Sequence, residues 1–96
     1  MTAYMIAQID ITDPETFKEY QALVPATIEA FGGEYLVRGG EQVQLEGEAR
    51  SSRTVILRFP DMEAAKAWHA SPIYEKPLAL RQAAATGTLM LVDGLD

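Results

Sequence analysis

The order in which strand-like and helix-like segments alternate limits most strongly what this chain can fold into. Residues 3–11 and 53–59 alternate their side chains with period two, which is typical of β-strands. Shorter extended runs are expected at residues 34–38 and 88–93. A further extended run is expected at residues 42–45, followed by a polar loop that ends at residue 52.

Each helical stretch begins with residues that favour a helix start. Asp13-Pro14 predicts the first helix, because aspartate caps free backbone N–H groups and proline suits the first turn. Apolar side chains follow at helical spacing until Gly32-Gly33, a pair typical of a helix end. Asp61 predicts a second helix, and Ser71-Pro72 predicts that another begins directly after it and ends at Thr86-Gly87.

The resulting order, β-α-β-β-α-β, is the split βαβ or ferredoxin-like arrangement. It predicts an α+β fold with one antiparallel sheet, in which the first and third strands pair at the centre. The chain has 96 residues, which is below the usual domain size, so we expect a single domain spanning residues 1–96.

Composition excludes several classes of function. The chain has no cysteine, which rules out disulfide scaffolds, thiolate nucleophiles and cysteine-ligated metal sites. Fourteen acidic residues against eight basic ones disfavour nucleic acid as a partner, because phosphate binding needs a basic face. No apolar run is long enough to span a membrane, and the first residues lack a basic signal-peptide start, so we expect a cytoplasmic protein without membrane contact.

The sheet face that the helices leave uncovered is expected to be apolar. Its residues are Tyr4, Ile6, Ile56, Met90 and Val92. Such a patch is unfavourable on a monomer, so we expect a two-fold homodimer in which two sheets pack face to face. The alternative is that loop 39–52 folds over this face within one chain.

Two charged residues are expected at the ends of the long strands, on the same uncovered face. We expect the first and third strands to be parallel neighbours, which would place Asp10 and Arg58 close together. An ion pair between them, within the chain or across the dimer, would explain why a charge is tolerated at Arg58.

One group of residues recurs, in order and spacing, over essentially the whole chain. These residues are Asp13-Pro14, Tyr20, Gly32-Gly33, Arg38-Gly39-Gly40, Glu46-Gly47, Arg53, Phe59-Pro60, Ala65, Trp68, Ser71-Pro72, Tyr74 and Arg81. With them the sequence resembles the large, mostly bacterial family called domain of unknown function 1330, within the dimeric α+β barrel superfamily. The resemblance implies a ferredoxin-like fold and a homodimer, and it carries no established reaction.

Relatives at the superfamily level include small monooxygenases and isomerases that hold a substrate between helices and sheet, and also proteins without known catalysis. The sequence departs from its family at two positions. Arg58 stands where such sequences often have a glutamate, and His69 stands where they tend to carry an aromatic or other residue. The first departure weakens the expectation of an enzyme.

His69 is the candidate catalytic residue, because it is the only histidine and histidine titrates near neutral pH. It could act as a general base beside Trp68, although a helix histidine next to an aromatic residue is more often structural. A single histidine without cysteine, and without Glu-x-x-His or His-x-x-x-His spacing, predicts that no metal is bound. The glycine pairs lack the spacing of phosphate-binding loops, and we expect no cofactor.

A cluster of arginine, tyrosine and glutamate side chains is the candidate binding site. Its members are Tyr20, Arg38, Glu46, Arg53, Tyr74 and Arg81. Arginine recognises carboxylate or phosphate through two parallel hydrogen bonds, and tyrosine can orient a polar group. One hypothesis is therefore a cleft for a small anionic or polar molecule. The alternative is an ion-pair and hydrogen-bond network that pins loop 39–52 to the second helical region.

Together these patterns favour a homodimer that binds a small molecule between sheet and helices. Two other functions are kept as alternatives. One is a cofactor-independent small enzyme of the monooxygenase or isomerase type, and the other is a structural or regulatory interaction module. The sequence identifies neither a reaction nor a ligand.

Overall fold

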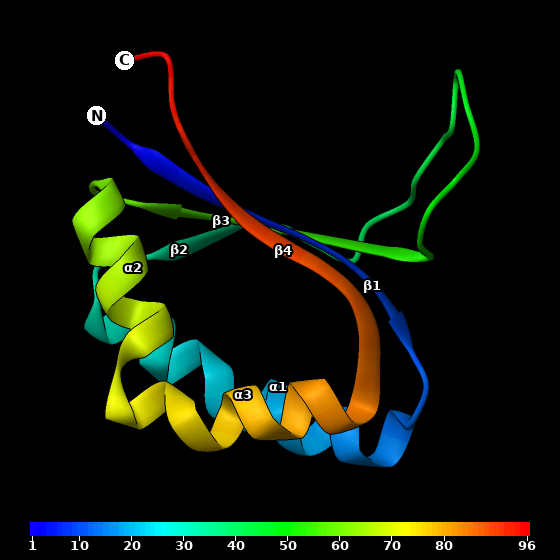
Figure 1. Cartoon of the computed structure of the whole chain (residues 1–96), viewed down its shortest axis with the longest axis horizontal. Helices are drawn as coiled ribbons and strands as arrows, with labels where there is room; N and C mark the ends of the chain where they lie inside the picture. The colour runs from blue at the N-terminus through cyan, green and yellow to red at the C-terminus, as the bar shows by residue number, and fades with distance from the viewer.

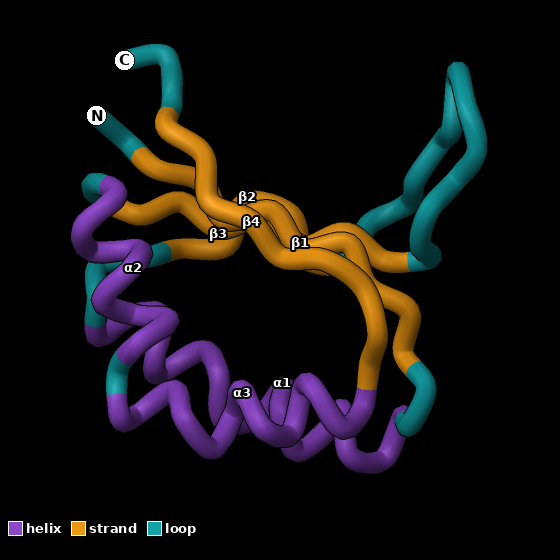
Figure 2. The backbone as a smooth tube through the Cα atoms, in the orientation of Figure 1, coloured by secondary structure: helices purple, strands orange, loops and turns teal.

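Three helices cover one face of a four-stranded sheet, and the other face of the sheet is open (Figure 1, Figure 2). The computed structural model describes all residues, Met1–Asp96. Its elements are β1 (Ala3–Ile11), α1 (Pro14–Ala30), β2 (Glu34–Arg38), β3 (Arg53–Phe59), α2 (Met62–Ala70), α3 (Pro72–Ala84) and β4 (Ala85–Asp93). The strand order is β2-β3-β1-β4, and all neighbouring strands are antiparallel. The α+β architecture and the central β1–β3 pair expected from the sequence are confirmed.

The expected helix starts are present, and two of them are capped by aspartate. The Asp13 carboxylate accepts hydrogen bonds from the Thr16 backbone N–H at 3.3 Å and the Thr16 hydroxyl at 2.7 Å. The Asp61 carboxylate accepts one from the Ala64 backbone N–H at 2.8 Å. Ser71 precedes α3 without capping it, and its hydroxyl instead donates to the Trp68 carbonyl at 2.8 Å. The starts of α1 and α2 therefore follow from local capping interactions, as the sequence indicated.

The core lies between the sheet and the helices. Its largest fully buried side chains are Trp68, Tyr74, Phe59 and Leu57. The Trp68 indole N–H donates to the Thr27 hydroxyl at 3.0 Å, so the one polar atom of this large side chain has a partner. None of the helices is long and apolar enough to cross a membrane.

Two segments differ from the expected elements. The helix α3 does not continue to Thr86-Gly87: it ends at Ala84, and β4 follows directly. Gly87 lies inside β4 with a φ of 142°, against the β1 backbone at Gln8, where a side chain would have no room. Residues 42–45 are not a strand, because no neighbouring strand pairs with them.

Residues 40–52 form an irregular arm, the green segment that rises from the sheet on the side away from the helices (Figure 1). The arm stands beside the open sheet face and does not close over it. On that face Tyr4, Ile6 and Ile56 are half-buried, whereas Met90 and Val92 are 55% and 41% exposed. The expected apolar patch is therefore present and uncovered within the single chain.

The expected ion pair between Asp10 and Arg58 is absent within the chain. Because β1 and β3 are antiparallel, Arg58 lies opposite Tyr4, at the far end of β1 from Asp10. Arg58 instead pairs with Glu34 of the neighbouring strand β2, and the Asp10 carboxylate accepts a hydrogen bond from the Ser52 backbone at 2.8 Å. The expectation of parallel neighbours was wrong, since β1 and β2 are the strands that run parallel, with β3 between them.

Candidate functional site

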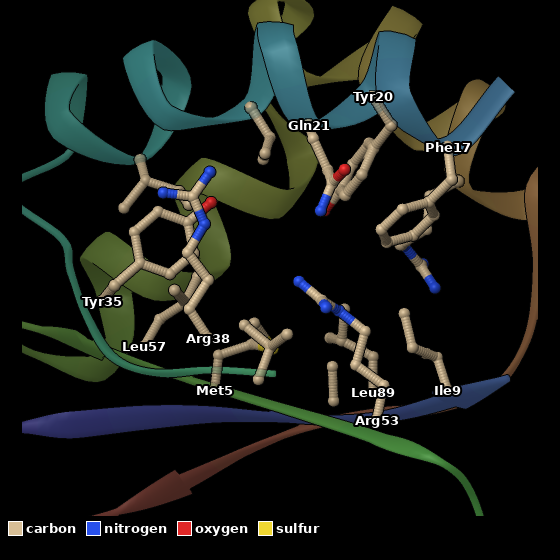
Figure 3. Close-up of a pocket in the computed structure, with 15 residues that line it drawn as sticks. Met5, Ile9, Phe17, Tyr20, Gln21, Tyr35, Arg38, Arg53, Leu57 and Leu89 are labelled. Atoms are coloured by element: carbon tan, nitrogen blue, oxygen red, sulfur yellow. The ribbon is translucent and has the colours of Figure 1, made fainter. Parts of the chain in front are cut away.

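A small, partly open cavity lies between the helical layer and the sheet, with a volume of about 30 Å³. Eleven of its fifteen lining residues are hydrophobic. Its longer polar side chains come from α1, β2, β3 and α3, and they are Tyr20, Gln21, Tyr35, Arg38, Arg53 and Arg81. Figure 3 shows Arg38 and Arg53 reaching from the sheet toward α1, while Tyr20 and Gln21 point from α1 toward the sheet.

Three arginines share this apolar cavity without an acidic partner. The chain contains two ion pairs, Lys18 with Glu15 and Arg58 with Glu34, and neither involves the cavity. The Nε atoms of Arg53 and Arg81 are buried and have no hydrogen-bond partner. An unsatisfied buried donor costs about 1–3 kcal/mol. The cavity therefore carries an uncompensated positive charge and unused hydrogen-bond donors.

Aromatic rings partly replace the missing acids. The Arg38 guanidinium lies over the Tyr35 ring, 4.6 Å from its centroid, and the Arg53 guanidinium lies 5.6 Å from the centroid of Phe17. Such contacts are weaker than a desolvated ion pair and leave the in-plane N–H groups free. The guanidinium groups are thus held in place with donors still available.

A β-bulge in β2 directs two of these side chains into the cavity. Tyr35 lies opposite Leu57 and Arg38 lies opposite Val55, with the register shifting at Leu36 between them. In a regular strand, residues 35 and 38 would point to opposite faces of the sheet. The extra residue reverses the alternation, so that Tyr35 and Arg38 both face the helices.

Gly39 makes room for the Arg53 side chain. It has a φ of 72°, and a Cβ atom at this position would collide with the Arg53 guanidinium. The Gly39 backbone N–H donates to the Thr54 carbonyl at 2.9 Å, which holds the start of the arm against β3. The Arg53 guanidinium can therefore pack directly against the backbone at residue 39, because this residue lacks a side chain.

Two tyrosine hydroxyl groups meet at the helical side of the cavity. The hydroxyl oxygens of Tyr20 and Tyr74 lie 3.3 Å apart, and Tyr74 is fully buried against Trp68, with ring centroids 4.3 Å apart. Burial raises the pKa of Tyr20, and the neighbouring Tyr74 raises it further. Burial also raises the pKa of Tyr35, although Arg38 opposes this. The cavity hydroxyls therefore keep their protons at physiological pH and can act as hydrogen-bond donors.

The structure brings together four of the six residues of the predicted cluster. Tyr20, Arg38, Arg53 and Arg81 line the cavity, and Tyr74 lies behind Tyr20 as a support. Glu46 lies in the arm, fully exposed, and does not line the cavity. No ion pair or side-chain hydrogen bond joins the cluster to the arm, so the expected network that pins this loop is absent.

The candidate catalytic residue lies outside the cavity. His69 is exposed on α2 and borders a second, open groove together with Lys66 and Arg81. Arg81 lines both the groove and the cavity. No cluster of three or more histidine, cysteine, aspartate or glutamate side chains suitable for a metal ion occurs in the chain.

Sequence reasoning missed several residues of the cavity and its surroundings. Tyr35 and Gln21 line the cavity, and Gly39 positions Arg53. The β-bulge that turns Tyr35 inward is not visible in the sequence. A regular period-two strand would place Tyr35 and Arg38 on opposite faces of the sheet, so the pattern alone does not bring both to the cavity. The Gly39-Gly40 pair did mark a turn, but only the packing shows which of the two glycines is required.

The family model for Domain of unknown function (DUF1330) matches residues 2–95. The chain belongs to this family. The search of curated proteins found no match to the sequence of this chain.

Solved structures share the fold of this DUF1330 protein at low sequence identity. A protein of unknown function from Rhodopseudomonas palustris superposes with a TM-score of 0.81 at 18% identity, covering 99% of this chain and 83% of the other. A dimeric ferredoxin-like protein of unknown function from Jannaschia sp. gives a TM-score of 0.68 at 14% identity, covering 96% of each chain. SnoaB, a cofactor-independent oxygenase from Streptomyces nogalater, gives 0.65 at 14% identity, covering 99% of this chain and 94% of SnoaB. These similarities establish the ferredoxin-like fold.

Proposed function

We propose that this protein binds a small, largely apolar molecule with one anionic group, such as an aromatic or short aliphatic carboxylate. The observation that carries the proposal is the convergence of Arg38, Arg53 and Arg81 on an apolar cavity without any acidic partner. A carboxylate would supply the acceptor that the buried Nε atoms of Arg53 and Arg81 lack.

The chemistry of the cavity selects among ligands. Its lining has three cationic side chains and no aspartate, glutamate or histidine, so it favours an anion over a cation. The apolar walls favour a ligand whose body is hydrocarbon or aromatic. The neutral Tyr20 hydroxyl can donate a further hydrogen bond to the anionic group.

Thermal unfolding with a matched set of compounds tests this proposal. Benzoate and hexanoate should stabilise the protein, whereas benzyl alcohol and benzylamine should not. At ten times its dissociation constant, a ligand stabilises the fold by about 1.4 kcal/mol, which raises the Tm of a chain of this size by about 6–11 °C. Arg53→Met should remove the shift, and Arg50→Met, which removes an exposed arginine of the arm, should retain it. Equal shifts in both variants, or none with either carboxylate, would refute binding in this cavity.

We also propose that the functional unit is a homodimer formed through the open sheet face. The support is the uncovered apolar patch described above, in which Met90 and Val92 are the most exposed members. The similar protein from Jannaschia is described as dimeric, which agrees with this assembly. Light scattering after gel filtration should give twice the 10.5 kDa chain mass, and a monomer at micromolar concentration would contradict the proposal.

A cofactor-independent enzyme acting on the bound anion is the second candidate. The observation that favours it is Tyr20, whose hydroxyl lines the cavity and keeps its proton, so it could donate to an oxyanion that forms there. The fold similarity to SnoaB is compatible with this role. Mass spectrometry of a stabilising ligand after aerobic incubation decides between the two functions: an unchanged ligand indicates binding alone, and an oxidised or isomerised one indicates catalysis.

A further inference from the structure

The arm, residues 40–52, exposes aliphatic and acidic side chains to solvent. Val43 and Leu45 are 73% and 88% exposed. The arm carries three glutamates and a single arginine, and Glu46 and Glu48 flank the turn at Gly47. It is therefore a polar, acidic arm that exposes two aliphatic side chains and projects away from the body of the molecule (Figure 2).

A groove of complementary character lies at the opposite edge of the sheet. It is bounded by α2, α3 and the edge strand β4, and has a volume of about 520 Å³. Its basic side chains are Lys66, His69 and Arg81, and it has no acidic one. Its apolar wall is formed by Leu89, Met90 and Leu91.

The arm cannot reach this groove within one chain. It leaves the sheet from β2 and re-enters at β3, whereas the groove runs along β4, and β2 and β4 form the two opposite edges. Any contact between the arm and the groove must therefore join two copies.

We propose that the arm of one copy lies in the basic groove of a second copy and brings Glu46 to its Lys66 and His69. The inference rests on the homodimer proposed above, and the sheet register supports it. Across the sheet Arg38 is level with Val55, Ala7 and Leu89, so the arm begins at the height of the groove. A two-fold axis along the strands, between the two open faces, places the β2 edge of one copy over the β4 edge of the other at this same end.

Two further properties fit this arrangement. The strand β4 has a free edge with unpaired backbone groups, and residues 42–45 have the extended pattern that could pair with it. Arg81 lines both the groove and the cavity, so the arm of the second copy would form part of the wall at this side of the ligand site.

Disulfide cross-linking tests the contact directly, because the chain has no cysteine of its own. In a variant with both Glu46→Cys and His69→Cys, mild oxidation should produce a covalent dimer within minutes. Neither substitution alone should do so. A control with Glu46→Cys and Glu29→Cys, which places the second thiol at an exposed position near the end of α1 that does not line the groove, should also remain uncross-linked.

Charge reversal provides an independent readout by analytical ultracentrifugation. Glu46→Lys should raise the dimer dissociation constant about tenfold, because each ion pair occurs twice in a two-fold dimer. Adding Lys66→Glu should restore most of the affinity, whereas Glu29→Lys, with the same charge change, should leave it unchanged. A dimer without the cross-link and insensitive to Glu46→Lys would overturn the arm contact and leave the sheet interface intact. A monomeric wild type would overturn both.

Discussion

Substitution of Gly39 by alanine tests whether this glycine positions Arg53 for ligand binding. Residue 39 has a φ of 72°, a conformation that costs an alanine about 1–2 kcal/mol. The added Cβ would also occupy the space of the Arg53 guanidinium, which must then shift from its present position. We therefore expect Gly39→Ala to lower the free energy of unfolding by at least about 1–2 kcal/mol.

The effect on ligand binding should be larger than the effect on stability. A hydrogen bond between an ionised donor and a carboxylate contributes about 1.5–3 kcal/mol. Displacing Arg53 should therefore raise the dissociation constant of benzoate by about 10- to 150-fold. Isothermal titration calorimetry well below the Tm measures affinity in the folded protein, and urea denaturation measures stability separately.

The neighbouring glycine supplies a matched control. A Cβ atom added at Gly40 would meet no other atom within 4 Å, and Gly40 has no positive φ, so Gly40→Ala should change neither quantity appreciably. In an Arg53→Met background, Gly39→Ala should have little further effect on benzoate affinity, because the guanidinium that it displaces is already gone. If Gly39→Ala binds benzoate as tightly as Gly40→Ala, Gly39 does not position Arg53 for the ligand.

Three other perturbations test separate parts of the structure. Thr27→Val removes the acceptor of the buried Trp68 indole N–H, and urea denaturation should show a loss of about 1–3 kcal/mol; an unchanged midpoint would contradict this. Hydrogen bonds from Thr16 hold the pKa of Asp13 below its usual value, so this cap stabilises α1 at neutral pH and the contribution is lost as the pH falls below about 4. Asp13→Ala should accordingly lower the Tm at pH 7 and have a smaller effect at pH 3, whereas equal effects at both pH values would argue against an ionised cap. Met90→Glu places charges on the open sheet face and should shift the protein to monomer in light scattering while circular dichroism still shows a folded chain; a persistent dimer would exclude this face as the interface.

The sequence predicted most of the residues of the candidate site, but it predicted their arrangement in space only in part. Tyr20, Arg38, Arg53 and Arg81 meet in the cavity because elements that border the same layer must face one another across it. The expected contribution of Glu46 did not appear within the chain, because the loop that carries it has no strand or helix beside it to draw it inward.

The sequence alone determined the elements and their order. Alternation at residues 3–11 and the caps Asp13 and Asp61 act through neighbours a few residues away, so their effects are visible without knowledge of the fold. The apolar character of the open sheet face followed from the same alternation.

Only the tertiary structure decided how distant segments meet. The partner of Arg58 depends on the direction of the neighbouring strands. The inward orientation of Tyr35 and Arg38 depends on a β-bulge opposite β3. The need for glycine at position 39 depends on the guanidinium of Arg53, fourteen positions away in the sequence. These are packing relations between residues that local preferences cannot couple. They convert a set of arginines spread along the chain into one apolar cavity with uncompensated positive charge.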